Sequence, residues 1–266
     1  AEIDAYWASG EPRGKAGEYA GLACNLYAGC DHGCTYCYAP AATRRTRETF
    51  NTPHPRAGIL EKLLSDADEL AERNERRSIL FSFTCDPYQK VDERHQITRE
   101  ALKVLLGHGL NVTILTKGGA RSERDFDLLA EHPDQVTYAA TLVFTNEEQR
   151  LRYETGTAAR TAERIAALKR AHGLGIRTWV SLEPVFDPGQ SLDLIRQTYE
   201  FVDLYKVGTL NYMQEAKAID WATFGYDAIA LLDSLGKDYY IKDDLKRHLN
   251  VRRDDVRKPR SLAAGL

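Results

Sequence analysis

The sequence predicts an α/β protein: a partial (βα)6 TIM-like barrel of parallel strands with a C-terminal helical extension. Six short segments rich in apolar and β-branched residues alternate with helical patterns along the 266-residue chain. The segments are almost continuously apolar, as expected of a parallel sheet that is covered on both faces. A closed barrel of eight units would need two more repeats. The expected strands are Leu22–Ala28, Ser78–Phe83, Asn111–Thr116, Val136–Phe144, Ile176–Leu182 and Val202–Gly208.

A segment with helical periodicity precedes each strand after the first. The first of these, AGILEKLLSDADELAERN, places Ile59, Leu63 and Leu70 on one face. Two others, TREALKVLLGHG and ARTAERIAALKRAHGLG, end in glycine, which is a common helix stop. The sequence after Met213 has helical patterns and contains no further clear βα unit. No linker is apparent, so we expect one domain over residues 1–266, with its core at about 20–210 and the extension at about 211–266.

The composition is that of a soluble globular protein, with 43% hydrophobic and 28% charged residues and a mean hydropathy of -0.47. No apolar run reaches membrane-spanning length, and residues 1–14 contain no apolar signal-peptide core. We therefore expect a cytoplasmic protein. The net charge of -3 gives no overall basic field for a phosphate backbone. Short basic runs occur at Arg44–Arg47 and at 251–260.

Polar residues that suit chemistry follow several of the expected strands. A cysteine-containing loop follows the first strand, Cys85 and Asp86 follow the second, Lys117 the third and Glu183 the fifth. Active sites of parallel barrels lie at the carboxyl ends of the strands. We therefore expect these residues to converge at one edge of the sheet.

Three of the five cysteines lie within eight residues, in the polar stretch GCDHGCTYCYAP. Cys30, Cys34 and Cys37 have the spacing C-x3-C-x2-C. Three thiolates from one loop can hold three corners of an iron–sulfur cube. The fourth iron would then be open to an exogenous molecule, and an open coordination position marks reactivity rather than structure.

Two alternatives for the cysteines stay open. The three clustered cysteines and His32 would make a Cys3His zinc site, although the second pair of ligands that is typical of structural zinc sites is missing. Cys24 or Cys85 would supply a fourth cluster ligand, at a spacing unlike that of ferredoxins.

The spacing of the cysteines, with Tyr36 directly before the last one, resembles that of the radical S-adenosyl-L-methionine (SAM) enzymes. The resemblance implies a [4Fe-4S] cluster held by the three clustered cysteines, with SAM bound to the open iron. It implies that one electron, from an external donor such as flavodoxin or ferredoxin, cleaves SAM to methionine and a 5′-deoxyadenosyl radical. That radical abstracts hydrogen from the substrate. The family shares the partial (βα)6 barrel.

Four stretches resemble the branch of the family that contains spore photoproduct lyase and the DNA repair photolyase-like proteins. They are GCDHGCTYCYAP, SFTCDPYQ, LTKGG and YETGTAARTAERIAALKRAHGLGI. The resemblance implies that Lys117 contacts the SAM carboxylate and that Thr141 also contacts SAM. It marks Tyr38, which follows the third cysteine, as a candidate catalytic residue. The motif residues in the last stretch are Tyr153, Glu154, Gly156, Thr157, Arg164 and Ile165.

Four further residues have two interpretations each. Cys85 lies at or beside the place where spore photoproduct lyase carries the cysteine that returns hydrogen to the product radical, or it is a small buried residue at a strand end. Asp86 contacts the SAM amino group or belongs to a turn before Pro87. Glu183 suits the ribose hydroxyls of SAM or hydrogen bonds along the sheet rim, and Glu154 is similar.

The resemblance implies a lyase that cleaves or rearranges a carbon–carbon bond in a nucleobase-containing substrate. The substrate would be a thymine-dimer lesion in DNA, or a small modified nucleoside or base such as a queuine-type deazaguanine that is salvaged. The negative net charge favours a small or single-stranded substrate, because duplex repair has to grip phosphates. A second hypothesis is that the chain is not an enzyme but an iron–sulfur or zinc protein that acts as a sensor or scaffold.

Overall fold

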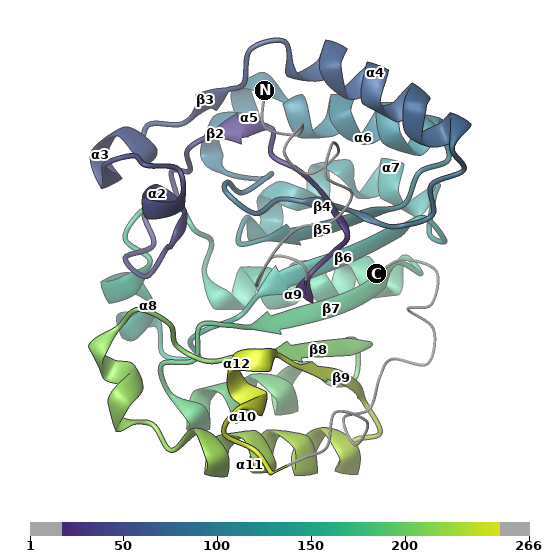
Figure 1. The fold of residues 1–266 in the computed structure, drawn as a ribbon. Coiled ribbons are helices and arrows are strands. Elements are labelled where there is room, and N and C mark those ends of the chain that lie inside the picture. Colours follow the sequence, from purple (N-terminus) through teal and green to yellow (C-terminus); the bar gives the residue numbers. More distant parts are fainter. Residues whose placement is uncertain (1–17, 251–266) are drawn as a thin grey trace.

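The computed structural model describes residues 18–250, which form one curved parallel sheet with helices along its outer side (Figure 1). The strand order is β1-β4-β5-β6-β7-β8-β9. Within residues 18–250 no pairing joins β1 to β9, so the barrel is open. The bounds are β1 Leu22–Cys24, β4 Ile79–Phe81, β5 Val112–Thr116, β6 Val136–Thr141, β7 Arg177–Leu182, β8 Leu204–Val207 and β9 Asp238–Ile241.

Helices connect successive strands and cover the outer face of the sheet. Short elements α2, α3 and α8 gather beyond the carboxyl end of the sheet, towards which the arrow of β7 points (Figure 1). A small antiparallel pair, β2 and β3, adjoins them. The remaining bounds are β2 Tyr27–Ala28, β3 His54–Pro55, α2 Ala39–Ala42, α3 Arg47–Phe50, α4 Ile59–Glu72, α5 Lys90–His95, α6 Ile97–Gly107, η2 Gly119–Asp125, α7 Phe126–Ala130, α8 Glu147–Tyr153, α9 Thr161–Gly173, α10 Pro188–Thr198, η3 Gln214–Ala218, α11 Trp221–Ser234 and α12 Asp243–Lys246.

The predicted fold class is confirmed, with differences at both ends of the sheet. The first expected strand splits into β1 and β2, which belong to different sheets. The expected helical extension also contains a strand, β9, which pairs in parallel with β8. β9 is an edge strand of four residues in which buried and half-buried side chains alternate, so it lacks the continuous apolar run of the other strands. Residues 1–14 and the basic run 251–260 lie outside the described residues.

Side chains of the strands alternate between two apolar surroundings. The set that faces the helices includes Leu22, Cys24, Ile79, Phe81, Val112, Ile114, Tyr138, Val180, Tyr205 and Ile241. The set that faces the barrel interior comprises Ala23, Leu80, Leu115, Ala139, Trp179 and Leu204. Because both faces are covered, the strands are apolar at nearly every position. Within residues 18–250, no helix is both long enough and apolar enough to cross the hydrocarbon core of a bilayer.

Tyr19 fills the barrel interior. Its ring packs against Trp179 at a centroid distance of 6.0 Å. Lys206 points into the same interior from β8, with its Nζ 4.7 Å from the Trp179 ring centroid. The ammonium donates to the carbonyl oxygens of Glu18 at 3.3 Å and Tyr19 at 3.0 Å. Burial and, next, the neighbouring charge of Lys242 lower the pKa of Lys206 to about 7.

Removing the amine of Lys206 changes how stability depends on pH. The unfolded chain holds this proton up to a pH near 10.5 and the folded chain releases it near 7, so the wild-type free energy of unfolding rises with pH between these values. In Lys206→Met the rise should be smaller, by at most about 1.4 kcal/mol per pH unit. Urea titrations at pH 7, 8, 9 and 10 measure it. The exposed Lys169→Met is the control, and identical slopes for the two variants would contradict the prediction.

That the chain forms a single domain stays a prediction, and β9 offers a test of it. Ile241 is fully buried in the core that the helices cover. If β9 unfolds together with the rest of the sheet, Ile241→Ala should cost about 2–5 kcal/mol of unfolding free energy in a single transition. Leu151→Ala, at a side chain that is 57% exposed, should cost less than about 0.5 kcal/mol. A separate early transition for Ile241→Ala would argue for an independent C-terminal unit.

Candidate active site

The cysteine loop, residues 29–38, follows β1 and β2 at the carboxyl edge of the sheet. Gly29 opens the loop at a φ of +97°, and a Cβ there would lie 2.3 Å from the Phe50 carbonyl oxygen, so the position requires glycine. Cys34 is buried, Cys30 and Cys37 are half-buried, and all three are free thiols. The loop therefore presents three unpaired sulfur ligands at the barrel mouth.

The segment Tyr153–Thr157, which begins at the last residue of α8, holds the cysteine loop from one side. The two stretches pair like antiparallel strands, with a bridge between Cys34 and Glu154. A Cβ on Gly156 would lie 2.2 Å from the Asp31 carbonyl oxygen, so glycine allows this close approach. The backbone hydrogen bonds are Thr35 N to Tyr153 O (2.8 Å), Gly156 N to His32 O (3.0 Å) and Thr157 N to Asp31 O (3.0 Å).

A buried ion pair lies directly behind this contact. Arg164 donates to both carboxylate oxygens of Glu154, and each residue is only 1% exposed. Tyr36 Oη donates to Glu154 Oε1 at 2.5 Å. Arg164 also donates to the carbonyl oxygens of Thr141 (3.1 Å) and Ala159 (2.9 Å). Burial alone would raise the pKa of Glu154, but the Arg164 charge overcomes this and holds it below its ordinary value. The pair thus ties the cysteine loop to the end of β6.

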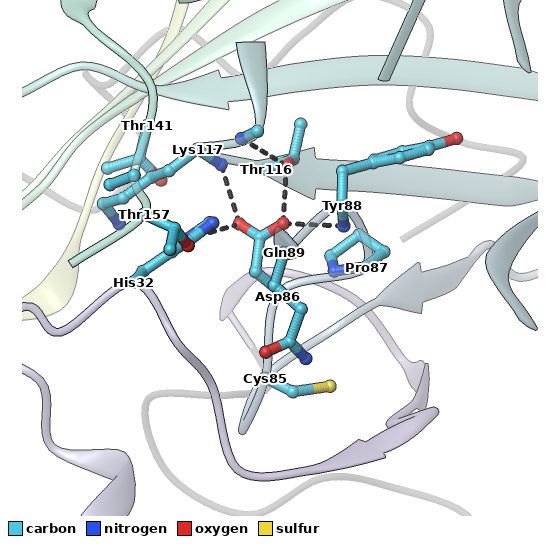
Figure 2. A network of polar contacts seen from close by, with 12 residues as sticks. His32, Cys85, Asp86, Pro87, Tyr88, Gln89, Thr116, Lys117, Thr141 and Thr157 are labelled. Atoms are coloured by element: carbon cyan, nitrogen blue, oxygen red, sulfur yellow. Dashed lines mark hydrogen bonds and ion pairs between the residues drawn. The ribbon is translucent and has the colours of Figure 1, made fainter. Parts of the chain in front are cut away.

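Asp86 ties the ends of β4 and β5 to the cysteine loop (Figure 2). Its Oδ1 accepts from the Tyr88 amide at 2.8 Å and from the Thr116 hydroxyl at 2.6 Å. Its Oδ2 accepts from the Lys117 amide at 2.7 Å and lies 3.5 Å from His32 Nδ1. Protein donors use both carboxylate oxygens. The structure therefore favours a structural role for Asp86, in which it holds the turn and the strand ends, over a contact with the SAM amino group.

His32 does not join the cysteines as a ligand. Its Nδ1 faces Asp86 and its Nε2 lies 3.3 Å from an Arg121 guanidinium nitrogen. Burial lowers the pKa of His32 to about 4, although Asp86 opposes the shift, so the ring is neutral. Among residues 18–250, no three Cys, His, Asp or Glu side chains converge closely enough to hold one metal ion. This geometry disfavours a Cys3His zinc site, whereas a cube binds its ligands at separate irons.

Lys117 extends over the cysteine loop from the end of β5. Its Nζ lies 5.7 Å from the Tyr36 ring centroid. Burial raises the pKa of Cys34 to about 12, while the Lys117 charge acts in the opposite direction. Thr141 ends β6, the strand that pairs with β5, and lies beside Lys117 (Figure 2). The structure therefore brings Tyr36, Lys117 and Thr141 together next to the cysteines.

The two candidate catalytic residues have different surroundings. Cys85 Sγ lies 3.1 Å from Ser82 Oγ and packs against the core that the helices cover. Figure 2 shows its sulfur directed away from the Asp86 network. This placement favours the interpretation of Cys85 as a buried residue at a strand end. Tyr38 is 47% exposed, and its hydroxyl donates to the Phe83 carbonyl at 2.9 Å.

Glu183 lies at the centre of a polar network on the opposite side of the barrel mouth. Its carboxylate accepts from Tyr19 Oη at 2.7 Å, forms an ion pair with Lys242 and accepts from the Asn211 amide at 3.3 Å. These contacts join the ends of β7, β8 and β9 to the residues before β1. They favour the rim-holding interpretation of Glu183 over a contact with ribose. Lys242 was missed because it follows β9, the strand that the sequence did not reveal.

Two arginines support the cysteine loop in ways that the sequence motifs do not specify. Arg47 donates to the carbonyl oxygens of Cys34 at 3.0 Å and Thr35 at 2.5 Å. Arg164 shares the buried face of α9 with Ala167, Leu168 and Ala171. A charged residue on an apolar helix face requires a buried partner, so this signal was present in the sequence. The partner, Glu154, could be identified only in the structure.

The fold is an open parallel barrel, and one loop at its mouth carries three thiols. Together they define an α/β protein that can hold a metal cluster. The donor set fits an iron–sulfur cluster, since three thiols lie on one braced loop beside the Lys117 ammonium. Residues 24–202 match the profile of the radical SAM superfamily. The chain belongs to the radical SAM superfamily, and its cofactors are a [4Fe-4S] cluster and SAM.

Individual proteins similar to this chain include the uncharacterized protein Rv2578c of Mycobacterium tuberculosis. It is 30% identical over 182 residues, which cover 64% of this chain and 52% of that protein, so the match spans about half of the relative's length. Spore photoproduct lyase superposes with a TM-score of 0.68 at 13% identity, over 91% of this chain and 85% of that one. SuiB of Streptococcus suis, bound to S-adenosylmethionine, superposes with a TM-score of 0.63 at 14% identity, over 85% of this chain and 51% of that one. These structural similarities show the fold alone.

The close approach at Gly156 makes a prediction about the cysteine loop. In Gly156→Ala the new Cβ meets backbone atoms of Asp31 and His32, so the two segments have to separate. We expect a loss of about 1–3 kcal/mol of unfolding free energy. We also expect fewer irons per chain after reconstitution, as measured by iron and sulfide analysis. Gly173→Ala, whose Cβ meets nothing within 4 Å, is the control. Equal iron contents in the two variants would show that the loop does not depend on this contact.

Proposed function

We propose that Cys30, Cys34 and Cys37 ligate three irons of the [4Fe-4S] cluster and leave the fourth to SAM. The single observation that carries the proposal is the braced loop, which presents three free thiols beside Lys117 at the barrel mouth. Bound together, the reduced cluster and SAM supply radical abstraction of a hydrogen atom. The protein binds them, orients SAM and restricts water at the barrel mouth.

The residues beside the cysteine loop would orient SAM. The Lys117 ammonium suits the SAM carboxylate as a point charge. Tyr36 and Thr141 lie next to it and would contact other parts of the molecule. No SAM contact is proposed for Asp86 or Glu183, because their carboxylates are engaged in holding the ends of the strands.

We propose a lyase-type reaction on a nucleobase-containing substrate. The support is the resemblance of four sequence stretches to the spore photoproduct lyase branch, and the half-exposed ring of Tyr38 at the mouth. The net charge of -3 favours a small modified nucleoside or a single-stranded lesion over duplex DNA. Tyr38 is the candidate catalytic residue that faces the mouth, and Cys85 is the weaker candidate. A cytoplasmic setting with flavodoxin or ferredoxin as electron donor completes the proposal.

Anaerobic reconstitution tests the proposal. The protein would be loaded with iron and sulfide, reduced with dithionite and given SAM, and 5′-deoxyadenosine would be quantified. Assays without substrate, with UV-irradiated DNA and with a panel of modified nucleosides separate the substrate classes. We expect the C30A/C34A/C37A variant to lose both iron and deoxyadenosine, and Cys85→Ala, as the matched cysteine control, to retain both. Deoxyadenosine formed by the triple variant would contradict the ligand assignment.

A further inference from the structure

The Glu154–Arg164 pair is a fully buried ion pair in direct contact with the cysteine loop. Glu154 forms the backbone bridge with Cys34, and its carboxylate accepts from Tyr36, two residues further along. Arg164 lies on the far side of this carboxylate and reaches Thr141 and Ala159. The carboxylate is therefore the nearer of the two opposite charges to the cysteine loop.

We propose that Glu154 is a positioning residue that lowers the reduction potential of the cluster, by placing a fixed negative charge behind Cys34. The inference rests on the proposed ligation of the cluster by Cys30, Cys34 and Cys37. An added electron makes the cluster more negative, so a nearby carboxylate opposes reduction and a nearby cation favours it. A low potential matches the chemistry, because the reduced cluster has to pass an electron to SAM.

Three features make Glu154 suited to this role. It is 1% exposed, so neither water nor salt screens its charge effectively. The Arg164 guanidinium donates to both of its oxygens, and this bidentate ion pair holds the carboxylate in its charged form. Its position is fixed by the hydrogen bond from Tyr36 and by the bridge to Cys34. A surface carboxylate would also be ionised, but water and salt would screen its charge and its side chain would be mobile.

The other charges around the loop have both signs: Asp31 lies in the loop and Asp86 faces His32, and the nearby cations are what Glu154 balances. Lys117 lies above Tyr36, and Arg47 donates to the loop carbonyls of Cys34 and Thr35. Arg150, which is 5% exposed, has its Nη1 at 3.9 Å from Glu154 Oε2. Without Glu154, these cations and Arg164 would stabilise the reduced cluster. The Glu154 carboxylate thus offsets part of the charge of these cations.

The test is a potentiometric titration of the reconstituted protein, followed by the EPR signal of the reduced cluster, without SAM. Glu154→Gln keeps an acceptor for Tyr36 and removes the charge. At a fixed potential we expect about a tenfold higher ratio of reduced to oxidised cluster, which is a shift of 59 mV for a one-electron couple. Glu148→Gln, on the exposed side of α8, is the matched control and should leave the potential unchanged.

A second variant separates charge from structure. Arg150→Gln removes a positive charge and leaves the Glu154–Arg164 pair intact. It should therefore lower the reduction potential, whereas Glu154→Gln should raise it. A loosened loop would not shift the potential in opposite directions in the two variants. If Glu154→Gln fails to retain a cluster, the reduction potential of Arg150→Gln alone tests the inference. Unchanged potentials in every variant that holds a cluster would overturn the inference and leave the proposed function standing. A wild-type protein without any reducible cluster would instead overturn the proposed function.

Discussion

The pairing of the cysteine loop with the segment Tyr153–Thr157 is the constraint on which the rest of the site depends. The loop has no regular secondary structure of its own, and it contains glycines where the chain turns sharply. Its shape comes from backbone hydrogen bonds to a segment more than a hundred residues away. The buried Glu154–Arg164 pair fixes that segment to the sheet, since an unpaired charge at either position would be costly.

The parallel sheet meets a second requirement of the site, because it brings side chains from distant parts of the chain to the same edge. Each strand ends at the same edge, so Lys117 after β5 and Thr141 in β6 lie beside the loop that follows β1. Asp86, which follows β4, locks this alignment by accepting hydrogen bonds from Thr116 and Lys117 at the end of β5. The polar residues at the edge therefore divide into those that hold the scaffold and those that remain to face ligands.

The sequence alone could identify six of the seven strands of the main sheet, the cysteine loop and Lys117, because continuous apolar runs and cysteine spacing are local signals. It could not separate the two kinds of carboxylate. Asp86 and Glu183 both follow a strand, as a ligand-binding residue would, and their partners lie far along the chain. Cys85 shows the same difficulty, because the direction of a side chain after a strand end depends on the local backbone. β9 was missed because an edge strand with one half-buried face has too few apolar residues.

The contacts of Glu18 and Tyr19 have a consequence for synthesis on the ribosome. Tyr19 reaches Glu183 across 164 residues of sequence, and Glu18 reaches the Asp243 amide across 225. Glu18 and Tyr19 thus leave the ribosome long before their partners Asp243 and Glu183. Such high contact order slows folding, because loop closure has to precede the stabilising contacts. Until β7 has been made, Tyr19 lacks Trp179 and stays exposed in the nascent chain, which leaves apolar surface of the barrel interior open to aggregation.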